Sequence, residues 1–218
     1  MKLILSLFLL FVSPFIKDNT LQEKHPFEDE IIAFEKADKE RFPTKNSILF
    51  TGSSSIRLWN DLAERFPEKK VINRGFGGSG LGDLIYYADR IVYPYKPKQI
   101  VIYSGENDIS DGKTPAQVLA DFKILYTSIR KKLPNTPVAY ISMKPSPSRA
   151  DKLEQVKEAN ELIRDFLKIQ KKATYIDVFN KMLGDDQQPR PELFLQDRLH
   201  MNEQGYDIWT QTIKPYLK

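Results

Sequence analysis

Short apolar runs alternate with longer amphipathic stretches along most of this chain. Each apolar run is typical of a buried β-strand, and each amphipathic stretch repeats its apolar positions with the period of an α-helix. We predict strands at residues 47–51, 70–74, 99–103, 138–142 and 173–178. We predict helices at residues 26–42, 115–133, 151–172 and 203–217.

This alternation predicts an α/β fold, because strands buried on both faces belong to parallel sheets that helices cover on both sides. Right-handed crossovers restrict the topology to a doubly wound sheet. We expect a three-layer α/β/α, flavodoxin-like sandwich with a parallel five-stranded sheet of order 2-1-3-4-5. Residues 26–218 then form one domain, since no internal repeat or low-complexity linker divides them.

The first 17 residues form a separate hydrophobic segment. An apolar run at 3–16 follows Lys2 and precedes the polar residues KDNT. The run is too short for the hydrocarbon core of about 30 Å and is typical of a signal peptide. Pro14 would directly follow a cut after Ser13, so the segment is either cleaved at a poor site or kept as a short anchor. We expect an exported protein, periplasmic or secreted, that meets a membrane only through this segment.

Composition removes several classes of function. The formal net charge is +4, and lysines and arginines are scattered, which indicates a solvated surface rather than a nucleic-acid partner. There is no cysteine, so disulfides, thiolate catalysis and cysteine-bound metals are excluded. His25 and His200 are the only histidines, so a multi-histidine zinc site is excluded too. We expect neither a metal nor a nucleic acid as partner.

The segments that follow the predicted strands carry the candidate chemistry. In a doubly wound sheet, ligands bind beyond the carboxyl ends of the strands, where the strand order reverses. The segments are GSSSIRLW at 52–59, NRGFGGSG at 73–80 and SGEND at 104–108, and DRLH at 197–200 precedes the last helix. We expect all four to meet at one edge of the sheet.

Together these segments resemble the four sequence blocks of the SGNH (GDSL-type) esterases, from about residue 27 to the end of the chain. The first block is usually G-D-S, and Ser53 stands here in place of the aspartate. The matching positions are Gly52, Ser53 and Ser54, then Gly77 and Gly78, then Gly105, Glu106 and Asn107, and lastly Asp197 and His200. The subgroup that the chain resembles most is that of the platelet-activating-factor-acetylhydrolase-like esterases.

This resemblance implies hydrolysis of a carboxylic ester through an acyl-serine intermediate, without a cofactor. Among three adjacent serines it selects Ser54 as the nucleophile, because Ser54 aligns with the serine of G-D-S. The implied partner is a small-molecule ester with a short acyl group, acetyl first, on a carbohydrate, a lipid or another small alcohol.

The residues support the same chemistry on physical grounds. A serine hydroxyl needs a base to take its proton, and imidazole is suited to that near neutral pH. His200 is the plausible base, since His25 lies beside Pro26 ahead of the first helix. Asp197 is three residues before His200, near enough to accept from the ring N–H and fix its tautomer.

An oxyanion develops in ester hydrolysis and needs hydrogen-bond donors. The backbone N–H of Ser54, the backbone N–H of Gly78 and the side-chain amide of Asn107 would supply three. Glycine suits the second position because no side chain blocks the close approach of the backbone.

Charged residues near the predicted site have weaker assignments. Candidate substrate contacts are Arg57, Arg74, Lys144 and Arg149, although each is individually more typical of a surface or structural residue. Residues 143–149, after the fourth strand, are the first choice among them. Glu106 and Asp108 are interpreted as loop carboxylates without a catalytic role, and Asp177 as a polar group at a strand end.

Other interpretations of the same residues remain. A serine run after a strand is often a helix cap, and the glycine segments are typical of turns. The chain could be a lysophospholipase or thioesterase, or a non-catalytic binding protein on the same fold. Gly75, Gly77 and Gly80 match a dinucleotide-binding fingerprint, but they follow the second strand, and no acidic residue stands at the expected distance.

Overall fold

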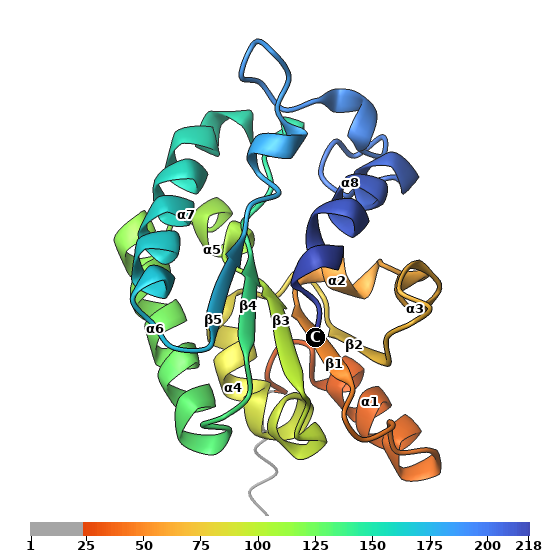
Figure 1. Ribbon diagram of the computed structural model, residues 1–218. Coiled ribbons are helices and arrows are strands. Elements are labelled where there is room, and N and C mark those ends of the chain that lie inside the picture. Colours follow the sequence, from red (N-terminus) through yellow and green to blue (C-terminus); the bar gives the residue numbers. More distant parts are fainter. Residues whose placement is uncertain (1–23) are drawn as a thin grey trace, which may run out of the picture.

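Five parallel strands form the central sheet of the computed structural model, which describes residues 24–218 (Figure 1). The strands are β1 (Ile48–Gly52), β2 (Val71–Gly75), β3 (Gln99–Tyr103), β4 (Val138–Ile141) and β5 (Ala173–Ile176). Their order is β2-β1-β3-β4-β5, which confirms the predicted topology. The predicted hydrophobic segment, residues 1–17, lies outside the described residues.

The three neighbouring strands β2, β1 and β3 end at the same level. Gly52 at the end of β1 is paired with Gly75 of β2 on one side and with Tyr103 of β3 on the other. The segments that follow these strands therefore begin side by side, as the strand order requires of a site at the carboxyl edge.

Helices connect the strands and cover the sheet. They are α1 (Glu28–Glu40), α2 (Ser54–Arg57), α3 (Leu62–Arg65), α4 (Leu81–Ile91), α5 (Glu106–Ser110), α6 (Pro115–Lys132), α7 (Leu153–Lys168) and α8 (Glu203–Ile213). Within residues 24–218, none of them combines the length and the apolar character needed to cross a membrane.

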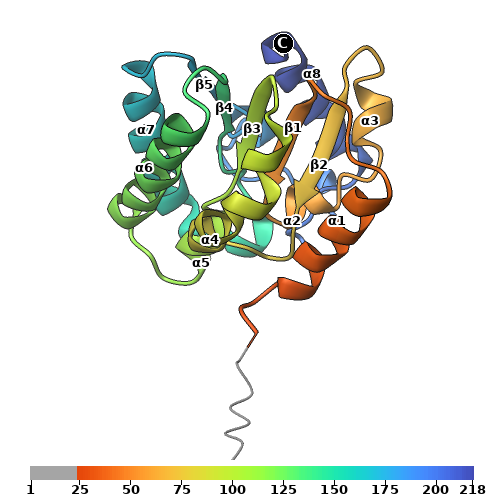
Figure 2. The ribbon, with the colours of Figure 1, turned by 90° about the horizontal axis from the view of Figure 1, so that it is seen from below.

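Two hydrophobic cores lie on opposite faces of the sheet. The first is formed with α1, α4, α6 and α7, and the second with α2, α3 and α8. Figures 1 and 2 show α6 and α7 on one side and α3 and α8 on the other. Fully buried aromatic rings fill both cores. In the first core Phe122 packs edge-on against Tyr140, and in the second the ring centroids of Trp209 and Tyr103 lie 4.8 Å apart. Burial of a large apolar side chain contributes about 1.5–3 kcal/mol, so these rings hold the helices on the sheet.

Two predicted elements differ from those in the structure. The predicted helix at 151–172 is a 3-10 segment at Pro147–Lys152 followed by α7, which begins at Leu153. Arg149 has non-helical angles inside that segment, so the α-helix cannot start earlier. The predicted fifth strand also ends early, at Ile176, because the Asp177 carboxylate accepts from the backbone N–H of Asn180 and turns the chain.

Candidate active site

Ser54 is the first residue of α2 and follows β1 almost directly. Gly52 makes this possible: its φ is +130°, and a Cβ there would lie 1.8 Å from the carbonyl oxygen of Tyr103. Only glycine fits so close to the neighbouring strand. Ser53 and Ser55 on either side are buried, whereas the side chain of Ser54 is partly exposed. Of the three adjacent serines, Ser54 is thus the one that the fold presents.

The short helix α2 is held from both sides. The Tyr206 hydroxyl of α8 donates to the carbonyl of Ser55 at 2.9 Å, and the Asn73 side chain donates to the carbonyl of Ile56 at 2.7 Å. Four residues make a marginal helix by themselves. These contacts with β2 and α8 therefore fix the position of Ser54.

Asp197 and His200 lie in the loop that precedes α8. The Asp197 Oδ1 atom accepts from the backbone N–H of Leu199 at 2.9 Å and of His200 at 3.0 Å. Its Oδ2 atom lies 2.6 Å from Nδ1 of His200. Burial alone would raise the pKa of Asp197, but these hydrogen bonds lower it to about 2. The carboxylate is therefore ionised at neutral pH and fixes the orientation of the ring.

The structure brings His200 together with Ser54 from a distant part of the chain. With the Nδ1–H donating to Asp197, the Nε2 atom is left to accept, and it lies 3.0 Å from Oγ of Ser54. This distance is within hydrogen-bond reach for a nucleophile and its base. The three residues that the sequence nominated for acid–base and nucleophilic chemistry therefore form one connected chain of contacts.

Gly78 and Asn107 lie beside Ser54 and line the same pocket. A Cβ built on Gly78 would lie 3.9 Å from Nδ2 of Asn107, so the two residues are neighbours. The Asn107 amide donates one N–H to the carbonyl of Ser79 at 3.0 Å, which leaves its second N–H free. The backbone N–H groups of Ser54 and Gly78 form no hydrogen bond with any other described residue. Three N–H groups without a partner among the described residues thus belong to residues that line the Ser54 pocket.

Arg149 lies behind Asn107 and also reaches the pocket. Its Nη2 donates to Oδ1 of Asn107 at 2.9 Å, and its Nη1 lies 3.2 Å from Oε1 of Glu106. Because the guanidinium takes the amide oxygen, the amide nitrogen of Asn107 faces the other way, toward Gly78 and Ser79. The sequence interpretation of Arg149 as a substrate contact overlooked this link.

Glu106 is a buried carboxylate, which corrects its interpretation as a loop group. It accepts from Nζ of Lys144 at 2.6 Å and from the Ser146 hydroxyl at 2.6 Å, and the Tyr103 hydroxyl donates to it as well. Burial alone would raise the pKa of Glu106, but the positive charges of Lys144 and Arg149 lower it. The result is a fixed negative charge behind the pocket that holds Arg149.

Asp108 is also buried and does not behave as a loop carboxylate. It accepts from the backbone N–H of Leu81 at 2.9 Å and from Lys113 at 2.8 Å. It therefore caps the start of α4, where a negative charge is favourable.

Two of the four predicted substrate contacts lie at the pocket and two lie elsewhere. Arg57 and Arg149 line the pocket. The structure does not bring Lys144 there, because its side chain is 1% exposed and paired with Glu106. Arg74 is also elsewhere: its guanidinium pairs with Asp38 and packs on the ring of Phe34. Both side chains are occupied by protein partners and play structural roles.

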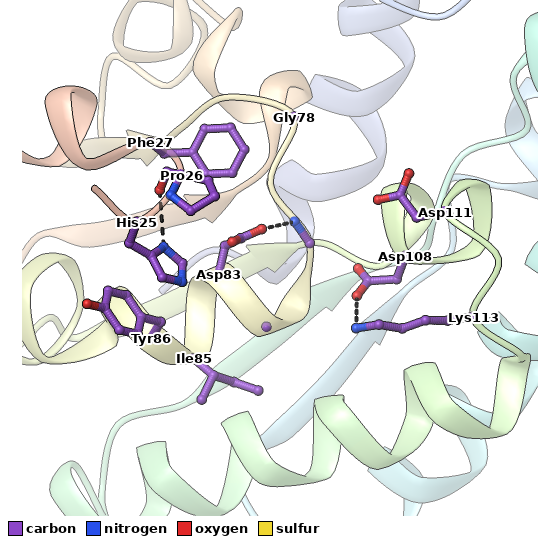
Figure 3. Close-up of a pocket in the computed structure, with 12 residues that line it drawn as sticks. His25, Pro26, Phe27, Gly78, Asp83, Ile85, Tyr86, Asp108, Asp111 and Lys113 are labelled. Carbon is purple, nitrogen blue, oxygen red and sulfur yellow. Dashed lines mark hydrogen bonds and ion pairs between the residues drawn. The ribbon is translucent and has the colours of Figure 1, made fainter. Parts of the chain in front are cut away.

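The pocket around Ser54 is small and polar, with a volume of about 280 Å³. Beside it lies a larger hollow of about 720 Å³ (Figure 3), and Gly78 and Asp111 line both spaces. The hollow received no assignment from the sequence. In the part of the chain that the structure describes, no three His, Asp or Glu side chains are grouped so as to hold a metal ion.

Comparison with protein families gives one match that covers most of the chain. The model of the GDSL-like lipase/acylhydrolase family matches residues 46–208, a range that includes every residue of the Ser54 pocket. Comparison with curated protein sequences gave no match.

Solved structures of the same fold are similar at low sequence identity. A candidate platelet activating factor from Streptococcus pneumonia has a TM-score of 0.78 at 21% identity, over 88% of this chain and 93% of that chain. A candidate acylhydrolase from Bacteroides fragilis has a TM-score of 0.76 at 19% identity, over 89% and 97%. An acetyl-xylooligosaccharide esterase from Geobacillus has a TM-score of 0.62 at 14% identity, over 79% and 94%. At these identities the likeness concerns the fold.

Proposed function

Because this chain belongs to the GDSL-like lipase/acylhydrolase family, a family of ester hydrolases, we propose that it is a serine esterase that removes short acyl groups, acetyl first, through an acyl-serine intermediate. The observation that carries the proposal is the chain of contacts from Asp197 through His200 to Ser54, with distances of 2.6 and 3.0 Å. Ser54 and His200 line a pocket that also contains free hydrogen-bond donors.

In this proposal Ser54, His200 and Asp197 each have a role. Oγ of Ser54 attacks the carbonyl carbon of the ester while Nε2 of His200 takes the hydroxyl proton. When the bond to the alcohol breaks, His200 returns that proton to the leaving oxygen, and the acyl group stays on Ser54. A water molecule then attacks the acyl group with His200 again as base, which releases the acid and restores the serine. Asp197 holds the ring and stabilises the imidazolium.

The oxyanion is bound by the N–H groups of Ser54, Gly78 and Asn107. Such donors contribute most when they are fixed before the reaction, because no reorganisation is then needed. Arg149 serves this purpose as a positioning residue, since it holds the amide oxygen of Asn107 away from the oxyanion. An amide turned the other way would place a carbonyl oxygen against the developing charge.

A short acyl group fits the pocket best. Its volume of about 280 Å³ lies at the lower end of ligand sites, and its lining is dominated by polar and charged residues. A long alkyl chain would find few apolar partners there. The fold shared with an acetyl-xylooligosaccharide esterase agrees with acetyl as the first choice. Export of the protein, expected from residues 1–17, is part of the same proposal.

The test is a panel of p-nitrophenyl esters of graded chain length with three serine variants. We expect kcat/KM to be highest for acetate and to fall toward octanoate. Ser54→Ala should lose several orders of magnitude in kcat, as for other members of a catalytic unit. Ser53→Ala and Ser55→Ala are matched controls and should keep measurable turnover.

Two results would contradict the proposal. A steep rise of kcat/KM with chain length would indicate a lipase, lysophospholipase or long-chain thioesterase instead. Equal activity of the Ser54→Ala variant and the wild type would exclude the acyl-serine route, and inactivity of the wild type on every ester and thioester would favour a binding protein.

A further inference from the structure

The hollow beside the Ser54 pocket lies between three segments of the chain. Residues 25–27 form one wall, α4 with the loop before it forms the floor, and residues 108–113 form the opposite wall (Figure 3). Its volume of about 720 Å³ is in the range of small-ligand sites. Since Gly78 and Asp111 belong to both spaces, a molecule bound in the hollow reaches the oxyanion side of the Ser54 pocket.

One end of the hollow carries a pair of stacked rings. The rings of His25 and Tyr86 are parallel, with an angle of 5° and centroids 3.8 Å apart. Tyr87 packs edge-on against both rings and holds them in place. Tyr86 is nevertheless 58% exposed. A supported and exposed aromatic ring offers a flat apolar face to a ligand without a large loss of side-chain entropy.

The other end carries charges of both signs. Figure 3 shows Asp108, Asp111 and Lys113 together there, opposite His25 and Tyr86. Asp108 and Lys113 form an ion pair at 2.8 Å, and Lys113 also pairs with Asp121 at 2.8 Å. Asp111 is exposed between the hollow and the Ser54 pocket. This end of the hollow thus offers carboxylate acceptors and the ammonium donor of Lys113, without an excess of positive charge.

We propose that this hollow binds the alcohol part of the ester and that this alcohol is a neutral carbohydrate. The inference rests on the proposed function and specifies its substrate class. A sugar ring has an apolar CH face that can lie on the ring of Tyr86. Its hydroxyl groups can donate to Asp111 and accept from Lys113, so a single ligand type satisfies both ends of the hollow.

Other ligand classes fit the same lining less well. A fatty acyl chain would leave the exposed carboxylate of Asp111 facing alkyl groups, and desolvation of an unpaired charge is costly. An anionic alcohol, such as a phosphate-bearing one, would face three carboxylates and a lysine that already has two acidic partners. A quaternary ammonium group is typically held by several aromatic faces, whereas Tyr86 is the exposed ring of this hollow.

The experiment compares three acetates that share the acyl group and differ in the alcohol: methyl acetate, an acetylated xylooligosaccharide and acetylcholine. Released acetate is measured for the wild-type enzyme and for Tyr86→Ala, Tyr86→Phe and Asp111→Asn. We expect kcat/KM to be highest for the sugar acetate. Tyr86→Ala should lower the ratio of kcat/KM on sugar acetate to that on methyl acetate about three- to tenfold, as expected for one aromatic contact.

Tyr86→Phe should restore most of that ratio, because it keeps the ring. Asp111→Asn should lower it as well, through a raised KM for the sugar ester. The matched control is Tyr216→Ala, because Tyr216 is an exposed tyrosine in a different hollow beside α8, and its substitution should leave the ratio unchanged.

The outcomes separate the two proposals. A wild-type enzyme that hydrolyses none of the three acetates contradicts the proposed function itself. An active enzyme with the same ratio in the wild type and in the Tyr86 and Asp111 variants overturns the carbohydrate site only. A preference for acetylcholine that Tyr86→Ala removes would assign the hollow to a cationic alcohol instead.

Discussion

The side-chain amide of Asn107 is held at both of its ends. Arg149 binds its oxygen at 2.9 Å and the carbonyl of Ser79 binds one N–H at 3.0 Å. We expect Asn107→Ala to lower kcat by about 10²- to 10³-fold with little change in KM, because the donor acts mainly in the transition state. Asn107→Asp should be worse at neutral pH, since it replaces a donor with a like charge. Steady-state kinetics and melting temperature check both variants.

Arg149 is expected to act through Asn107, and a double-mutant cycle tests that. Arg149→Lys should lower kcat about tenfold, as for loss of one charge-assisted hydrogen bond. In the Asn107→Ala background the same substitution should have almost no further effect on kcat. If Arg149 instead bound substrate, as its sequence position suggested, Arg149→Lys would raise KM and the two substitutions would be additive.

The lowered pKa of Asp197 makes the free energy of unfolding depend on pH. Its pKa is lowered from 3.8 to about 2 in the folded protein, so it stabilises the fold at neutral pH. That stability is present above pH 3.8 and is lost as the pH falls toward 2. The difference in melting temperature between the wild type and Asp197→Asn should be constant above about pH 5 and shrink between about pH 4 and pH 2.

Two observations would contradict this assignment. A difference in melting temperature that already shrinks between about pH 7 and pH 5 would mean that Asp197 is not held as the structure shows. A loss of activity over the same range is no contradiction, because Asp197 stays ionised there.

At the scale of elements, the segment after β4 joins the sheet to the site through a buried ion pair. Lys144 and Glu106 have side chains 1% and 5% exposed and lie 2.6 Å apart. We expect Lys144→Met to destabilise the protein by about 3 kcal/mol, because it leaves a buried carboxylate with Arg149 as its remaining cation. Lys144→Met combined with Glu106→Gln should recover part of the loss. Urea unfolding measures both.

A normal free energy of unfolding in Lys144→Met, together with a raised KM, would contradict this structural role. It would return Lys144 to the substrate contact that the sequence suggested. A structural role changes the free energy of unfolding and a substrate contact changes KM, so the Lys144→Met variant distinguishes them.

The elements themselves were largely predictable because of how they are buried. The fully buried strands β1, β3 and β4 appear as mostly apolar runs, and the half-buried edge strand β2 appears as a shorter one. All four were placed within one residue of their observed ends. The short helices α2, α3 and α5 have four or five residues each, which is too few for a helical repeat of apolar positions to be recognised in the sequence. The start of α7 was misplaced because Arg149 has non-helical angles inside the 3-10 segment that precedes this helix.

Local sequence could nominate some members of the site and not others. Ser54, Asn107, Asp197 and His200 stand in short blocks that resemble those of the SGNH esterases. The link from Arg149 to Asn107 joins residues 42 positions apart, and the pair of Lys144 with Glu106 joins residues 38 apart. No local pattern encodes such partners, so a buried carboxylate appeared to be a loop group.

At the scale of the whole molecule, the site depends on both faces of the sheet. Ser54 is placed by β1, β2 and α8, whereas the hollow beside it is built from α4 and the segment before α1. In the two proposals, the ester bond is cleaved at the carboxyl edge of the sheet, and the alcohol part of the ester binds over α4. A substitution in one of the two cores should therefore affect the two functions to different extents.

The contact of His200 with Ser54 spans 146 positions of the chain. Contacts of such separation close late in folding, because a long loop must be ordered before they form. Hydrolytic activity should therefore report completion of the fold rather than its onset. In refolding from urea, helical circular dichroism is expected to return first and turnover of acetate esters last, after α8 has docked. Turnover that returned together with the first helical signal would show that the two ends of the domain meet before the sheet between them is complete.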